Sequence, residues 1–138
     1  MNKNKGFSLV ELIVVVAIMA VLVGILAPAY LSYVEKTRRG TDENMAEEVR
    51  HTVEISAADI HVYDELKGGA TLAYSGGAQI ANVGTSYGQN FAEAMADTYA
   101  AKTFDIKSKK YNGKTYTVTV AAATGGTGAA LSVTGAWN

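Results

Sequence analysis

The stretch Lys5–Glu11 reads KGFSLVE, and the fold of the chain follows from what begins there. Apolar residues start at Phe7, one carboxylate follows at Glu11, and no charged side chain occurs from Leu12 to Val34. A run of this length predicts a membrane-spanning helix. A carboxylate in such a helix costs roughly 2.5–3.5 kcal/mol on insertion scales. Glu11 is therefore expected to have a partner or a function, unless it reaches headgroup water at the helix end.

The stretch Gly6–Ile13, GFSLVELI, resembles the class III signal of type IV prepilins and of the related pseudopilins. The resemblance covers about the first quarter of the chain. It implies that a dedicated peptidase cuts between Gly6 and Phe7 on the cytoplasmic side and then methylates the amine of Phe7. It also implies that Glu11, the fifth residue of the mature chain, meets the N-terminus of a subunit already in a growing fibre.

This resemblance and the composition together predict that the chain has three parts. Residues 1–6 are expected to be a prepilin leader and residues 7–29 an apolar helix for the membrane or a filament core. Residues 30–138 are expected to form a globular α+β domain that includes the amphipathic second half of the long helix. Basic residues lie on both sides of the span, at Lys3, Lys5, Lys36, Arg38 and Arg39. Charge therefore leaves the orientation open, and the resemblance places the leader in the cytoplasm.

One long helix is predicted for the first half of the chain. Pro28 lacks an amide donor and its ring clashes with the carbonyl of Gly24, which predicts a kink or local melting between the two. Beyond it, an apolar stripe repeats every three or four residues, and acidic residues occupy the other faces. Gly68-Gly69 is a stop signal, so we expect a continuous helix from about Phe7 to Leu66. The stripe consists of Met45, Val49, Val53, Ala57 and Ile60.

The second half of the chain predicts a small sheet. Residues 68–88 are interpreted as a connecting loop with weak strands. Asn90 and Glu93 form a capping-box pattern for a short helix that ends near Lys102. Asn112-Gly113 predicts a hairpin that joins strands before and after it. With a last strand over 131–137, the expected fold class is α+β: a long N-terminal helix packed on a small antiparallel sheet, as in type IV pilins.

Several functional classes find no support in the residues. The chain has 138 residues, no cysteine and a net charge of −1, so neither a disulfide nor a nucleic-acid partner is indicated. We find no nucleophile–base pair and no phosphate loop, so neither an enzyme nor a cofactor is expected. The candidate metal ligands lack suitable spacing, and the few acidic residues after Glu65 are too scattered for a calcium cage. Those candidates are Asp59, His61, Asp64 and His51.

Opposite charges gather in different parts of the chain. Acidic side chains cluster on the long helix between Asp42 and Glu65, whereas lysines recur from Lys102 to Lys114. These two patches could meet between neighbouring subunits. Two solvated faces explain the pattern equally well, because exposed ion pairs contribute only about 0–1 kcal/mol each.

The residues and the resemblance together predict a type IV pilin, as the repeated major subunit of a surface fibre for adhesion and motility. The partners implied are copies of the chain, membrane lipid before assembly, a prepilin peptidase, an inner-membrane platform protein and an assembly ATPase. The chain would be a single-pass protein of the cytoplasmic membrane before it enters an extracellular pilus. Two alternatives remain open: a pseudopilin of a type II secretion or DNA-uptake system, and a membrane-anchored binding domain that never polymerises.

Overall fold

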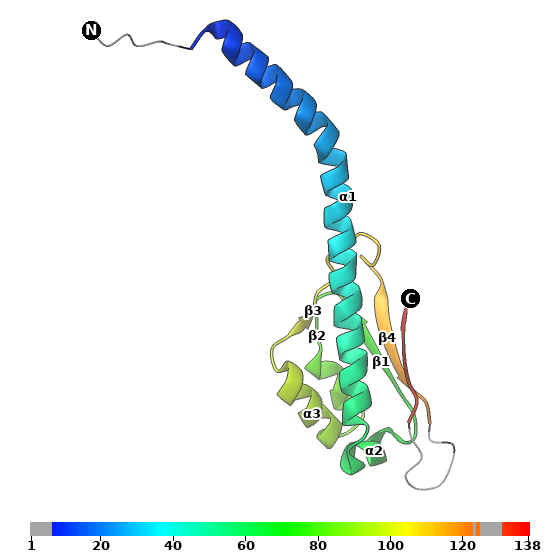
Figure 1. Cartoon of the computed structure of the whole chain (residues 1–138). Coiled ribbons are helices and arrows are strands. Elements are labelled where there is room, and N and C mark those ends of the chain that lie inside the picture. The colour runs from blue at the N-terminus through cyan, green and yellow to red at the C-terminus, as the bar shows by residue number, and fades with distance from the viewer. Residues whose placement is uncertain (1–6, 123, 125–130) are drawn as a thin grey trace, which may run out of the picture. The chain divides into compact units, whose positions relative to one another are not determined.

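The computed structural model describes residues 7–122, 124 and 131–138. It divides into two compact units, Met1–Thr37 and Arg38–Asn138. Helix α1 (Leu9–Ser56) contributes to both units, and all other elements belong to the second (Figure 1). These elements are α2 (Ile60–Leu66), β1 (Ala70–Ser75), β2 (Ala78–Gln79), the 3-10 helix η1 (Ala81–Ser86), α3 (Gln89–Tyr99), β3 (Thr103–Phe104), β4 (Thr115–Val120) and β5 (Val133–Trp137).

Helix α1 ends at Ser56, so the prediction of one continuous helix to Leu66 was wrong. The chain turns over residues 57–59, and a carboxylate oxygen of Asp59 accepts the amide of His61 at 2.8 Å, which caps the separate helix α2. Aspartate favours such a cap because its short side chain competes for local backbone amides. The turn ends the predicted apolar stripe: Ile60 is 61% exposed, whereas Leu66 is buried.

The main sheet has three antiparallel strands in the order β1–β4–β5. Figure 1 shows β1 and β4 side by side. Alternate residues point to the core, because successive side chains of a strand lie on opposite faces. The register therefore places Leu72 beside Val118 and Tyr74 beside Tyr116 on the buried face of the sheet. The C-terminal half of α1 covers that layer with three buried side chains, Ala46, Val49 and Val53. The α+β architecture predicted from the sequence is confirmed.

The pairing of the strands differs from the prediction in one respect. Asn112-Gly113 lies in a tight turn, with the amide of Lys114 donating to the carbonyl of Tyr111 at 2.9 Å. The predicted hairpin across this turn is wrong, because β3 pairs with β2 and β4 pairs with β1 and β5. Leu72-Ala73-Tyr74, interpreted as a weak strand in a loop, lies in the six-residue strand β1, which pairs with β4 along its whole length. The other predicted weak strand, near residues 80–83, is part of η1 and the residue before it.

A buried carboxylate explains why the chain before the turn does not pair with β4. Asp42 on α1 is 1% exposed, and its two oxygens accept the amides of Lys107 and Ser108 at 2.9 and 2.8 Å. Hydrogen bonds to an ionised group are stronger than neutral ones. The amides of Lys107 and Ser108 are thus bound to α1, and these two are not available for a sheet ladder.

Helix α3 is also capped by a residue from another element. The predicted capping box of Asn90 and Glu93 is wrong, because α3 begins at Gln89. Glu65 of α2 accepts the amides of Asn90 and Phe91 at 3.0 and 2.8 Å. These bonds lower the pKa of Glu65 below its ordinary 4.5, chiefly through the amide of Phe91. A carboxylate at this position satisfies free amides and complements the helix dipole.

The C-terminal strand is held without a disulfide. Asn138 and Thr115 exchange two backbone hydrogen bonds, at 2.9 and 3.1 Å. Trp137 stacks on Tyr111 with ring centroids 4.1 Å apart, and it also contacts Tyr116 at 5.1 Å. Strand pairing and aromatic packing therefore hold this end of the chain.

Candidate functional site

The predicted processing site lies at the beginning of the described chain. Phe7 is 89% exposed and precedes the first residue of α1 by two positions. Gly6, on the other side of the predicted cut, lies outside the described residues. Phe7 thus stands on an uncovered stretch of chain before the helix.

Glu11 has a partner within its own chain. Its Oε2 accepts the amide of Ser8 at 2.9 Å, and the carbonyl of Ser8 accepts the amide of Leu12 at 3.2 Å. Glu11 thus caps the N-terminus of α1, where a carboxylate is favoured. The spacing Ser-x-x-Glu is a recognised capping-box signal, and our sequence analysis missed it. One carboxylate oxygen bonds to Ser8, and the other has room for a further donor.

The apolar half of α1 is long and apolar enough to cross a membrane, and none of its most apolar window is buried inside the chain. Large side chains are exposed all along it, from Leu9 at 73% to Leu31 at 67%. The helix is continuous through Gly24 and Pro28, so this structure contains no local melting there. The predicted kink remains a prediction.

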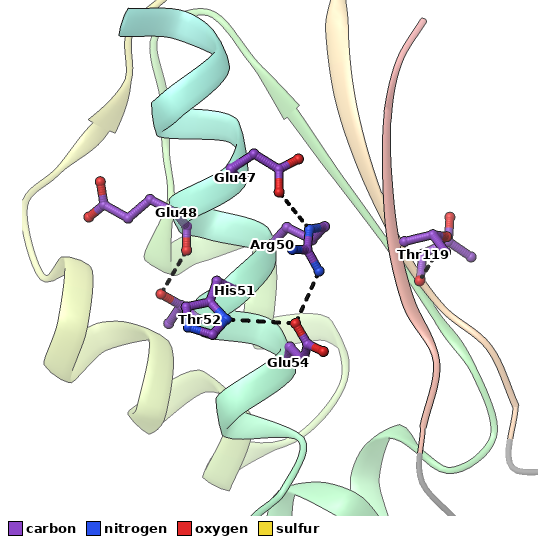
Figure 2. A network of polar contacts seen from close by, with 8 residues as sticks. Glu47, Glu48, Arg50, His51, Thr52, Glu54 and Thr119 are labelled. Atoms are coloured by element: carbon purple, nitrogen blue, oxygen red, sulfur yellow. Dashed lines mark hydrogen bonds and ion pairs between the residues drawn. The ribbon is translucent and has the colours of Figure 1, made fainter.

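The second half of α1 carries a network of opposite charges. Figure 2 shows Arg50 between two glutamates of the same helix. Its Nε lies 2.9 Å from Glu47 Oε2 and its Nη1 lies 3.0 Å from Glu54 Oε2. The hydrogen bond that Arg50 donates to Glu47 raises the pKa of Arg50, and the hydrogen bond and charge of Glu54 raise it further. Pairs three or four residues apart on a helix favour each other in this way.

Lysines from later in the chain also bind this helix. Lys102 Nζ lies 3.0 Å from Glu48 Oε1, and Lys110 Nζ lies 3.7 Å from Glu43 Oε1. The hydroxyl of Tyr111 donates to the same glutamate at 2.6 Å and is the main cause that lowers the pKa of Glu43. Part of the predicted contact between acidic and basic patches is therefore satisfied inside one chain.

Comparison with known proteins identifies the N-terminal segment. Residues 1–27 match the family model of the prokaryotic N-terminal methylation motif. This match covers the stretch that contains Gly6, Phe7 and Glu11.

Relatives extend the similarity into the second unit. Type IV major fimbrial protein FimA of Dichelobacter nodosus is 30% identical over 111 residues, which cover 80% of this chain and 63% of the relative. Prepilin peptidase-dependent protein A of Clostridium perfringens is 24% identical over 123 residues, or 86% of each chain. Fimbrial protein EcpC of Eikenella corrodens is 30% identical over 116 residues, which cover 81% of this chain and 71% of the relative. The chain thus spans less than two thirds of FimA.

No solved structure gives a significant match to the chain. The long N-terminal helix packs against a small antiparallel sheet, the architecture that the resemblance to type IV pilins implied. With the methylation motif at the start of that helix and fimbrial relatives that align beyond it, the chain belongs to the type IV pilin family.

Proposed function

We propose that the chain is the repeated, major structural subunit of a type IV pilus, an extracellular fibre used in surface adhesion and motility. The observation that carries the proposal is the uncovered apolar half of α1 with one carboxylate near its start. Apolar surface gains about 25 cal/mol for each Å² removed from water. Lipid covers this surface before assembly, and the same helices of neighbouring subunits cover it in a filament core.

Cleavage creates the positively charged amine that can pair with the Glu11 carboxylate. A prepilin peptidase cuts between Gly6 and Phe7 and methylates the new amine of Phe7, which stays positively charged. An amine and a carboxylate each lose hydration in an apolar core, and pairing them offsets much of that loss. We place the Phe7 amine of an incoming subunit against the Glu11 carboxylate of a subunit already in the fibre.

The remaining parts of the chain have matching tasks in this proposal. Residues 1–6 are the leader, residues 7–29 are the membrane and core helix, and residues 30–138 form the outer domain. A bend between Gly24 and Pro28 adapts the helix to the fibre. An inner-membrane platform protein and an assembly ATPase transfer subunits from the cytoplasmic membrane to the fibre.

Two substitutions at Glu11 test the pairing. Glu11→Ala removes both the cap and the charge, and Glu11→Gln keeps an oxygen for the Ser8 amide but removes the charge. Loss of one partner of a buried ion pair costs about 3–5 kcal/mol, more than a hundredfold in affinity. We therefore expect both variants to be cut and methylated at Phe7 and to yield almost no sheared fibre.

The comparison between the two variants separates the roles of Glu11. Fibres from Glu11→Gln at wild-type yield would show that the cap suffices and would refute the charge pairing. Electron microscopy of the sheared fraction measures fibre length as well as yield. Short fibres that stay within the cell envelope would indicate a pseudopilus. Loss of attachment and surface movement in cells without the chain tests the adhesion and motility roles.

A further inference from the structure

A cleft of about 580 Å³ lies at one end of the main sheet. It opens where β1 ends and β4 begins, because Ser75 pairs with Thr115 in the ladder. Ligand sites in proteins commonly have volumes of roughly 300–1,000 Å³. Its lining residues are Ser75, Gly76, Gly77, Asp105, Ile106, Lys107, Asn112, Gly113, Lys114 and Thr115.

The walls of this cleft are fixed by contacts outside it. The amide of Gly77 donates to the carbonyl of Phe104 at 3.0 Å, which joins two walls. The buried carboxylate of Asp42 holds the amide of Lys107 at 2.9 Å. A cleft whose walls are held in this way is formed before anything binds, so little ordering is needed on binding.

The lining of the cleft is positively charged. Lys107 and Lys114 are both exposed, and neither ammonium forms an ion pair with any residue that the structure describes. Asp105 also lines the cleft, with its Oδ1 accepting the hydroxyl of Thr103 at 3.0 Å. Two cations and one anion leave a net positive charge, which favours an anionic group.

Helix α3 presents an acidic pair without a partner. Glu93 and Asp97 are exposed, and within the described ranges neither carboxylate forms an ion pair or a side-chain hydrogen bond. The other face of α3 is buried through Phe91, Met95 and Tyr99. Residues four apart lie on one helix face, about 6 Å apart along the axis. The pair therefore faces outward as one anionic surface.

The cleft and the acidic pair belong to different ends of the second unit. The first turn of α3 is bonded to Glu65 of α2, the helix that precedes the start of β1. The cleft lies where β1 stops, six residues further along that strand. At the C-terminal end of α3, the Tyr99 hydroxyl lies 2.9 Å from that of Thr52 of α1. Lys107 of the cleft is instead held by Asp42, ten residues earlier on that helix and about 15 Å along its axis. The α3 surface of one subunit is thus free to meet the cleft of another.

We propose that the lysine cleft, Lys107 and Lys114, receives the acidic pair Glu93 and Asp97 of a neighbouring copy of this chain. The inference rests on the proposed fibre and names a contact between its outer domains. Because the two surfaces differ, the contact is heterologous: each subunit offers its α3 to one neighbour and its cleft to another. Repeated contacts of this kind build an open helical array.

Charge reversal in the full chain, expressed in a cell without the wild-type gene, tests the contact. Two double variants are made, Lys107→Glu with Lys114→Glu, and Glu93→Lys with Asp97→Lys. Like charges facing each other oppose association strongly, so each double variant should reduce sheared fibre by roughly tenfold or more. The fourfold variant restores opposite charges and the original net charge, and it should restore fibre yield.

A matched control shows that position matters and not total charge. Lys67→Glu removes an exposed lysine that pairs with Asp64 at 3.0 Å, away from the cleft. Combined with the two α3 reversals, it should not restore fibres, whereas Lys107→Glu in the same background has the same total charge and should restore part of the yield. Where a reversal lowers the amount of mature chain in the membrane, the neutral pair Lys107→Gln and Lys114→Gln replaces it. Wild-type fibres should also break at lower shear as salt rises, because salt weakens the attraction between exposed charges and shortens its range to about 8 Å at 0.15 M.

The outcomes separate this inference from the fibre proposal. Rescue by the fourfold variant but not by the Lys67 control supports the contact. Normal fibres from both double variants, or no rescue while mature chain is present at wild-type amounts, would overturn it and leave the fibre proposal intact. A cleft that binds a soluble anionic glycan while all variants assemble normally would also overturn it. No fibre from the wild-type chain would instead contradict the fibre proposal.

Discussion

The packing around Gly135 of β5 leaves no room for a side chain at that position. A Cβ at this position would lie 1.9 Å from the Tyr116 hydroxyl and 2.6 Å from its Cζ. Tyr116 is 2% exposed, and burial raises the pKa of its hydroxyl. The ring is held by Phe104 and Trp137 and has little room to move. The glycine is thus required by close approach rather than by an unusual backbone angle.

Gly135→Ala should therefore destabilise the second unit. Overpacking a well-filled site costs about 1–3 kcal/mol. We expect a lower midpoint for thermal unfolding of the full chain in detergent, followed by the near-ultraviolet signal of its aromatic residues. An unchanged midpoint would show that β5 moves away from Tyr116 at no cost.

Tyr116→Phe is the matched control for this clash. Its hydroxyl has no hydrogen-bond partner among the residues that the structure describes. Removal of an unsatisfied buried group should change stability by less than about 1 kcal/mol. In the double variant the penalty of Gly135→Ala should shrink, because the closest contact is gone. A penalty of the same size in both backgrounds would assign it to another cause.

At the same scale, some contacts could be found in the sequence and others could not. The bond between Glu11 and the Ser8 amide follows a local spacing of three residues. The bond between Glu65 and Phe91 joins residues 26 apart, and only the fold brings them together. Local capping rules therefore favoured Asn90 and Glu93, although a carboxylate of α2 already occupies that helix end.

At the scale of elements, the N-terminus of α3 is stabilised by a carboxylate that belongs to α2. The Glu65 carboxylate caps α3 in the space that the missing side chain of Gly88 leaves open. Folding lowers the pKa of Glu65 below 4.5. The ionised carboxylate therefore contributes fully to the stability of the folded state at pH values above 4.5. As the pH falls through the lowered pKa, the carboxylate takes up a proton and the contribution is lost.

Glu65→Gln should accordingly lower the thermal midpoint of the full chain at pH 7. The difference from wild type should shrink as the pH falls below the ordinary value of 4.5. Hydrogen exchange at the amides of Asn90 and Phe91 reports the cap directly and should speed up in the variant. Glu93→Gln, on the exposed face of the same helix, is the control. A difference that stays constant down to acidic pH would rule out the charged cap.

The strand order illustrates where prediction from sequence stops at the level of elements. The sequence predicted a strand after Asn112-Gly113 and a last strand over 131–137, where the structure has β4 and β5. Gly68-Gly69 marked the end of the helical part of the chain, which is the end of α2. Pairing was harder, because Asn112-Gly113 is a typical hairpin turn whose preceding segment is bound by Asp42. That aspartate looked like one more solvated acid of an amphipathic helix. Buried carboxylates that bind distant amides leave no periodic signal.

For the whole molecule, the N-terminal segment was the most predictable part. Its apolar run, its charge-free length and its single carboxylate are local properties, and α1 carries them as expected. The domain's aromatic core was less predictable, since Tyr74, Phe104 and Trp137 come from three separate strands. The family resemblance predicted the architecture, and the side-chain contacts within it depend on packing.

The fibre account requires that the chain be cut, methylated and moved out of the membrane. The most direct test is mass spectrometry of the intact chain and its N-terminal peptide, on material sheared from the cell surface. We predict an abundant mature chain that begins at N-methylated Phe7. Protein found only in the membrane fraction and still beginning at Met1 would contradict the account.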